Sequence, residues 1–95
     1  MSQVYKPLSN TISIMGNNGN TVYGAKFAMI YNRGNQYEII NFRHANNVLI
    51  GNLPIEHGTY LVVRKDPDDK LAGNNLIATS IQCLTDKENK CRIVV

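Results

Sequence analysis

The sequence has no tryptophan, and its 95 residues include only two phenylalanines, three prolines and two cysteines. It contains no apolar run of about 18 residues, which excludes a membrane-spanning helix. Charged residues make up 18% of the chain and hydrophobic residues 43%, a composition that argues against disorder. A chain of 95 residues is also too short for a two-domain enzyme with its own cofactor domain. We therefore expect residues 1–95 to form a single small domain.

The charge of the chain is mildly basic. Ten Lys and Arg against seven Asp and Glu give a net charge of +3, and the pI is about 9.0. This charge is spread along the chain instead of forming the stripe that is typical of nucleic-acid-binding domains. The first residues, MSQVYKPLSN, lack the apolar core of a signal peptide. The chain is therefore either intracellular or a mature secreted form that begins with a new Met1, and the secreted form is favoured.

Apolar residues alternate along most of the chain with the period of two that is typical of β-strands. Clusters of Asn, Gly and Pro, the residue types that occupy tight turns, separate the alternating segments. The predicted strands are Thr11–Met15, Thr21–Tyr31, Gln36–Arg43, Asn47–Ile50, Gly58–Lys65, Leu76–Leu84 and Lys90–Val95. Within Thr21–Tyr31, the residues that alternate with Phe27 are apolar or aromatic, so we expect Phe27 to be a core anchor.

Helical signals are weak, and only Pro67–Ala72 and His44–Val48 could form a single turn. Gly51-Asn52-Leu53-Pro54 is expected to break the strand that precedes it, and residues 1–10 are expected to form an irregular arm. The predicted fold is all-β, a small β-sandwich or a small closed barrel of six to seven short, mostly antiparallel strands.

The two cysteines fall in the last two predicted strands. If these strands form an antiparallel hairpin in which Ile81 faces Ile93, Cys83 faces Cys91. Directly opposed residues lie about 4.5–5.5 Å apart, which is compatible with a disulfide. The pattern leaves two alternatives open, a disulfide between Cys83 and Cys91 or two reduced thiols packed as small hydrophobic side chains.

No motif predicts a catalytic, cofactor or metal site. The two histidines are not spaced as zinc ligands relative to the cysteines, and Glu38 and Glu56 show no acid–base partner in their local sequence. The Asp66-Pro67-Asp68-Asp69 segment lacks the Gly and Glu that a calcium-binding EF-hand loop requires, so turn chemistry explains it. We therefore expect no enzyme activity, no cofactor and no metal.

One group of residues has the chemistry of a ligand face. Tyr37, Asn41 and Arg43 share one face of a predicted strand, and Tyr60 and Arg64 share one face of another. If these strands are neighbours, the aromatic rings can stack on bases while the arginines hold phosphates, as in small OB-like barrels that bind single strands. Alternatively, Tyr37 and Tyr60 pack against each other across the strands, with ordinary outward-facing arginines.

In length, strand count and single cysteine pair, the chain resembles the small secreted β-sandwich effectors of plant-pathogenic fungi known as the MAX class. The usual disulfide of that family joins the first strand to a late strand, whereas Cys83 and Cys91 lie in one predicted hairpin. The resemblance implies a non-catalytic protein that binds a host protein, often through an exposed strand edge.

These observations together predict a non-enzymatic β interaction module. A protein partner is favoured, because an open sandwich presents unpaired backbone groups to which a partner can add a strand. Single-stranded nucleic acid is the alternative ligand, and a homodimer through an edge strand is a further option. No association with a membrane is expected.

Overall fold

The computed structural model describes residues 5–16 and 19–83, and it confirms the all-β fold class. The described residues form eight strands and no helix, and every strand pair is antiparallel. The strands are β1 (Tyr5–Pro7), β2 (Ile12–Ser13), β3 (Phe27–Asn32), β4 (Glu38–Arg43), β5 (Leu49–Ile55), β6 (Tyr60–Arg64), β7 (Lys70–Ala72) and β8 (Leu76–Cys83).

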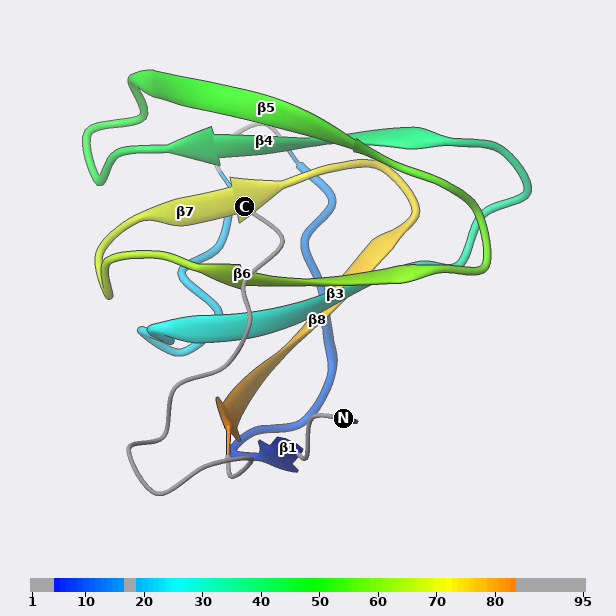
Figure 1. Cartoon of the computed structure of the whole chain (residues 1–95). Helices are drawn as coiled ribbons and strands as arrows, with labels where there is room; N and C mark the ends of the chain where they lie inside the picture. The colour runs from blue at the N-terminus through cyan, green and yellow to red at the C-terminus, as the bar shows by residue number, and fades with distance from the viewer. Residues whose placement is uncertain (1–4, 17–18, 84–95) are drawn as a thin grey trace.

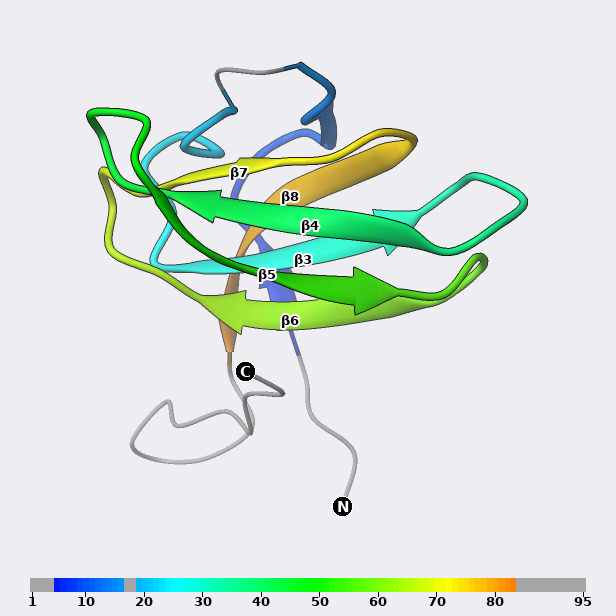
Figure 2. The same ribbon diagram turned by 90° about the horizontal axis from the view of Figure 1, so that it is seen from above.

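The described residues form two sheets (Figure 1). The larger sheet has the order β1-β8-β3-β6, with β2 beside β8, and the smaller sheet has the order β5-β4-β7. β8 is central in the larger sheet. β3 pairs with one side of it, and β1 and β2 pair with two different parts of β8. In the view from above, β4 and β5 lie over β3 and β6, so the two sheets stack face to face as a sandwich (Figure 2).

The core lies between the sheets and is built from aliphatic side chains. Ile40 and Leu71 of the smaller sheet pack in one cluster with Ile30, Val63 and Leu76 of the larger sheet. The other buried members of the cluster are Ile14, Val22, Ala25, Ala28, Ile55 and Ala78. None of these side chains carries a polar group, so burial alone accounts for their contribution to stability.

Along β7 the two sheets are joined by backbone hydrogen bonds. Asn20 and Leu71 exchange a pair of N–H···O bonds of 2.9 Å each, and Gly73 N donates to Ile14 O at 3.1 Å. Along β5 the situation differs, because β5 and β6 follow each other in the chain but belong to different sheets and share no ladder in the described residues. The predicted closed barrel is therefore wrong, and the sandwich alternative is confirmed.

The inner and outer faces of β3 are the reverse of those predicted. Ala28, Ile30 and Asn32 are buried, whereas Phe27 is half-buried and lies outside the core cluster. The alternation misled because both faces of this strand carry apolar residues, and because the strand begins only at Phe27. Before it, Val22, Tyr23 and Gly24 have positive φ angles of 55°, 59° and 70°. Because these residues form a left-handed turn and not an extended strand, their side chains do not alternate between two faces.

Other differences concern short segments. Tyr5–Pro7 form β1 instead of an irregular arm, and Lys70–Ala72 form β7 instead of part of a helical turn. β5 runs through Gly51 and Pro54, which were expected to break it. An edge strand tolerates a proline because its outward N–H is not needed for pairing, and that is the position of β5.

The predicted pair Cys83 and Cys91 remains a prediction. Cys91, the side chain of Cys83 and the predicted strand Lys90–Val95 lie outside the described residues. The described residues contain no helix long and apolar enough to cross a membrane.

Candidate functional site: an open seam between the two sheets

The structure does not bring the five predicted ligand-face residues together. Asn41 and Arg43 lie on β4 of the smaller sheet, and Tyr37 directly precedes that strand. Tyr60 and Arg64 lie on β6 of the larger sheet, which pairs with β3 and not with β4. The two strands are not neighbours, so the condition for one continuous face is not met. Alternation assigns residues to a face of their own strand but does not identify the neighbouring strand.

Tyr60 has a different aromatic neighbour from the one proposed. Its cross-strand partner is Tyr31 of β3, and the two side chains are 57% and 40% exposed. Opposed side chains on neighbouring antiparallel strands are close enough to interact. The outward face of the larger sheet therefore carries an accessible tyrosine pair at the end of β3 and the beginning of β6.

Asn41 and Arg43 instead line a hollow of about 360 Å³, together with Glu38, Gly73 and Asn74. Two of the charged side chains that line it already form hydrogen bonds within the protein. Arg43 Nη1 donates to Asn47 O at 3.0 Å, and Glu38 Oε2 accepts from Asn75 Nδ2 at 2.9 Å. Arg43 Nε has no hydrogen-bond partner in the described structure, but it is covered from solvent, so a ligand has no access to it in this conformation. These bonds assign structural roles to Glu38 and Arg43.

A second hollow lies where the sheets are not joined. β5 and β6 meet at the turn that connects them and diverge along their length (Figure 1). Between them is a hollow of about 270 Å³, lined by Phe42, Ile50, Gly51, Asn52, Leu53 and Arg64. Small-molecule sites typically measure about 300–1,000 Å³, so this hollow is closer in size to a site for one or two side chains. We call it the seam cleft.

β5 borders the seam cleft as an edge strand with unusual chemistry. It pairs only with β4 among the described residues, and its sequence, LIGNLPI, contains no charged residue. Leu49 and Ile50 are 47% and 48% exposed, and the neighbouring Val48 is exposed as well. Natural edge strands usually carry lysines or other charges that prevent pairing with another chain. β5 lacks that protection.

A β-bulge places Ile50 at the cleft. Phe42 faces Gly51 and Arg43 faces Leu49, so Ile50 is an extra residue without a partner on β4. Bulges redirect side chains and are common at sheet edges near functional sites. Here the redirected side chain is an isoleucine that lines the hollow.

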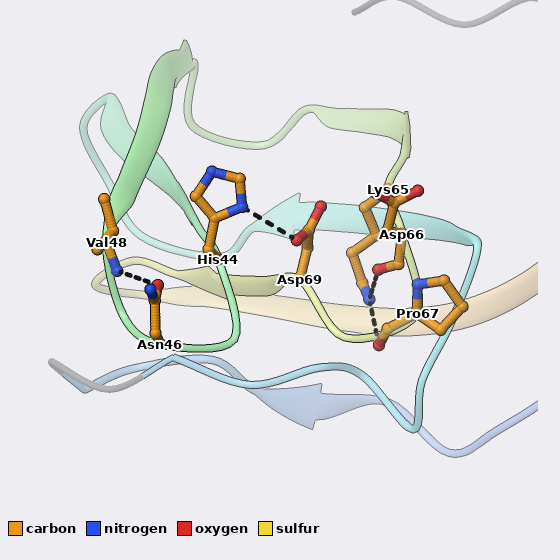
Figure 3. A network of polar contacts seen from close by, with 7 residues as sticks. All are labelled: His44, Asn46, Val48, Lys65, Asp66, Pro67 and Asp69. Atoms are coloured by element: carbon orange, nitrogen blue, oxygen red, sulfur yellow. Dashed lines mark hydrogen bonds and ion pairs between the residues drawn. The ribbon is translucent and has the colours of Figure 1, made fainter.

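The hairpin that carries Val48 is held in place by polar contacts (Figure 3). Asn46 Oδ1 accepts from Val48 N at 3.2 Å, and His44 N donates to Val48 O at 2.8 Å. Lys70 Nζ of β7 donates to Asn47 Oδ1 at 3.1 Å, and His44 Nδ1 lies 3.8 Å from Asp69 Oδ1. The apolar residues that follow the hairpin are therefore presented on a defined backbone.

Lys65 fixes the loop beyond β6 at the same end of the molecule. Its side chain is largely buried, and Nζ donates to Asp66 O at 3.2 Å and Pro67 O at 3.4 Å (Figure 3). Burial lowers the pKa of Lys65 below 10.5, although Asp69, Asp68 and Asp66 oppose the shift. The acidic segment that resembles a cation loop in the sequence is thus arranged around a lysine ammonium group.

The cleft residues Ile50, Gly51 and Leu53 were missed by sequence reasoning. A signal was available, because Val48, Leu49 and Ile50 are three consecutive large apolar residues and the side chains of a strand alternate between its faces. Both faces of this strand therefore carry apolar side chains, and in a two-layer sandwich only one face of a sheet is covered by the other sheet. Pro54 marked the same strand as an edge strand.

The described residues hold no group of three or more His, Cys, Asp or Glu that could bind a metal ion. No protein-family model matches the chain, and no curated protein or solved structure is significantly similar to it. The resemblance to MAX effectors therefore remains an expectation, and the function has to be argued from the site itself.

Proposed function

We propose that this chain is a non-enzymatic interaction module that binds an extended segment of a protein partner along the free edge of β5. The observation that carries the proposal is an uncharged edge strand with exposed Leu49 and Ile50 beside the seam cleft. Strand addition uses backbone hydrogen bonds for affinity and pockets for alternate side chains for specificity. The edge of β5 and the seam cleft offer both features.

The cleft also has room for a side chain of an added strand. A Cβ added at Gly51 would meet no atom within 4 Å, so open space lies over the middle of β5. The hairpin that leads into β5 is ordered by its own hydrogen bonds, which lowers the entropy lost when a partner binds. A role as a secreted effector is compatible with this binding mode but rests on the resemblance alone.

Capture from an extract of the organism that encodes the chain, followed by mass spectrometry, tests the proposal. The test compares wild type with Ile50→Asp, which places a charge at the cleft, and Gly51→Val, which fills the open space. Leu8→Asp is the matched control, because Leu8 is an exposed apolar residue that does not line the cleft. All three variants should fold, since Ile50 and Leu8 are exposed and Gly51 has no left-handed backbone.

We expect a partner that wild type and Leu8→Asp retain and that both cleft variants lose by about tenfold or more, which is the loss of about 1.4 kcal/mol of binding free energy. A partner retained equally by all variants would place the interface elsewhere and contradict the proposal. Recovery of no specific protein from this extract would contradict a partner within the organism that encodes the chain. A dimer of the chain that Ile50→Asp dissociates would replace the foreign partner with a second copy.

Single-stranded nucleic acid is a second candidate, supported by the exposed Tyr31–Tyr60 pair. Stacking of a base on an aromatic side chain contributes about 1–3 kcal/mol. If nucleic acid is the ligand, Tyr60→Ala weakens oligonucleotide binding by that amount, and the log–log salt slope is about −2. Oligonucleotide binding that disappears at moderate salt and is unaffected by Tyr60→Ala favours the protein partner.

A further inference from the structure

We infer that the segment bound at β5 carries a large apolar residue and an acidic residue two positions apart. This inference rests on the proposed function and specifies its ligand. It comes from the unequal composition of the seam cleft, which is apolar on the β5 side and has a single charged residue, Arg64, on the β6 side.

The apolar position follows from Phe42, Ile50 and Leu53. These side chains line the hollow, and Phe42 packs against the hydrophobic core cluster. The hollow therefore borders the hydrophobic core, and an aliphatic or aromatic side chain that enters it removes apolar surface from water on both partners. A volume of about 270 Å³ accepts such a side chain without rearrangement of the sheets.

The acidic position follows from Arg64. Its side chain is exposed, and it has no hydrogen bond or ion pair among the described residues. The nearby acids are arranged around other groups, since Asp69 lies beside His44 and all three acids of the loop attract Lys65. Arg64 is exposed and lines the cleft, so its guanidinium can form a bidentate pair with a carboxylate of the bound segment.

The spacing follows from strand geometry. Alternate residues of an extended strand lie on the same side, about 6.6–6.8 Å apart. When one side chain of the segment fills the hollow, the residue two positions away lies on the same side, and Arg64 is the charged residue of the cleft that it can meet. The ladder is limited to Leu49–Leu53, because Pro54 has no N–H to donate.

Defined peptides test the inference. The probe is an end-capped peptide of nine residues with Leu and Glu two positions apart in a Ser/Thr background. One control has Lys in place of Glu, and a second has Glu directly beside Leu. Binding is followed by NMR titration of wild type, Gly51→Val and Arg64→Glu, and the last variant alters only an exposed side chain.

We expect wild type to bind the Leu-x-Glu peptide about tenfold more tightly than the Lys peptide, with the adjacent-Glu peptide closer to the Lys peptide. Arg64→Glu should reverse the preference between Glu and Lys, and Gly51→Val should remove binding of all peptides. Equal affinity for the Glu and Lys peptides, or a preference that Arg64→Glu leaves unchanged, would overturn the inference while the β5 site stands. If no peptide binds, or if Gly51→Val binds like wild type, the inference and the proposed function both fail.

Discussion

The two long sides of this sandwich are closed in different ways. Along β7, the segments around Ile14 and Asn20 bridge the two sheets through backbone hydrogen bonds. Along β5, no ladder of the described residues joins the sheets, and a partly apolar hollow remains between β5 and β6. One side therefore uses its backbone groups to join the sheets, while the other ends in an edge strand that pairs only with β4 among the described residues.

Glycines show the same contrast. A Cβ added at Gly73, next to β7, would lie 2.8 Å from Ile39 O and would also collide with Leu76. A Cβ added at Gly51, on β5, would meet nothing within 4 Å. The same residue type thus permits close packing on one side and leaves space on the other. Close packing therefore requires a glycine at position 73, whereas position 51 has room for a side chain.

The open side is fastened at one end by Asn32. This residue is fully buried, and its Nδ2 donates to Ile55 O and to Gln36 O, each at 2.9 Å. Its Oδ1 accepts from Gly34 N at 2.9 Å, and its backbone bonds to Thr59 and Gly58. One side chain therefore ties the end of β3 to the end of β5 and to the loop before β4.

Breaking this tie should have the largest effect on stability. Asn32→Ala removes the side-chain partner of one buried carbonyl, that of Ile55, and of a partly buried carbonyl and N–H, and we expect a loss of about 3 kcal/mol in the free energy of unfolding. Urea denaturation measures it, with Asn35→Ala as the control, because Asn35 is an exposed residue of the same loop. A loss below about 0.5 kcal/mol for Asn32→Ala would show that the sheets are held together there by other contacts.

Alanine at the two glycines sharpens the comparison of the two sides. Gly73→Ala forces a side chain against the carbonyl of Ile39 and should cost about 1–3 kcal/mol, the usual range for overpacking. Gly51→Ala should be neutral or stabilise the fold by up to about 1 kcal/mol, because it restricts the unfolded chain without a clash. Thermal denaturation of the two variants measures both changes in stability. Equal destabilisation would mean that the β5 side is packed as closely as the β7 side.

The smallest expected effect concerns the loop that follows β6. Because burial lowers the pKa of Lys65, the unfolded chain binds more protons than the folded chain between the folded pKa and 10.5. Stability should therefore rise with pH across this alkaline window, and the cost of the buried charge is fully present below it. Lys65→Met removes this rise.

The measurement is the difference in free energy of unfolding between wild type and Lys65→Met from pH 7 toward pH 10.5. Lys26→Met serves as the control, because Lys26 is exposed. A difference that stays flat with pH would show that the Lys65 ammonium is as well solvated in the folded protein as in the unfolded chain.

The strands that alternate cleanly could be predicted from the sequence, and β4, β6 and β8 lie within the predicted segments. β7 could not, because its three residues follow the Asp-Pro-Asp-Asp turn and carry no period. Phe27 was assigned to the wrong face, because both faces of β3 are apolar and tertiary packing chose the smaller Ala28 and Ile30. The alternation of apolar residues along the strand does not show which of its two faces is buried.

Less of the candidate site could be predicted. Arg64 was predicted to belong to a ligand face, but Asn41 and Arg43 of that face lie on the other sheet, since the sequence does not specify which strands pair. The buried role of Asn32 was also hidden, because a turn position explains an asparagine equally well. The edge position of β5 was available from Pro54 and from the consecutive apolar residues, and reading them together would have located the seam.

Amide hydrogen exchange tests the central claim most directly. In the free protein, the amide of Leu71, which is bonded to Asn20 O, should exchange slowly, while the amides of Leu49–Leu53 that do not bond to β4 should exchange fast. When the captured partner is bound, exchange at these β5 amides should slow by about tenfold or more, with Leu71 unchanged. Protection that appears elsewhere while β5 continues to exchange fast would contradict the account.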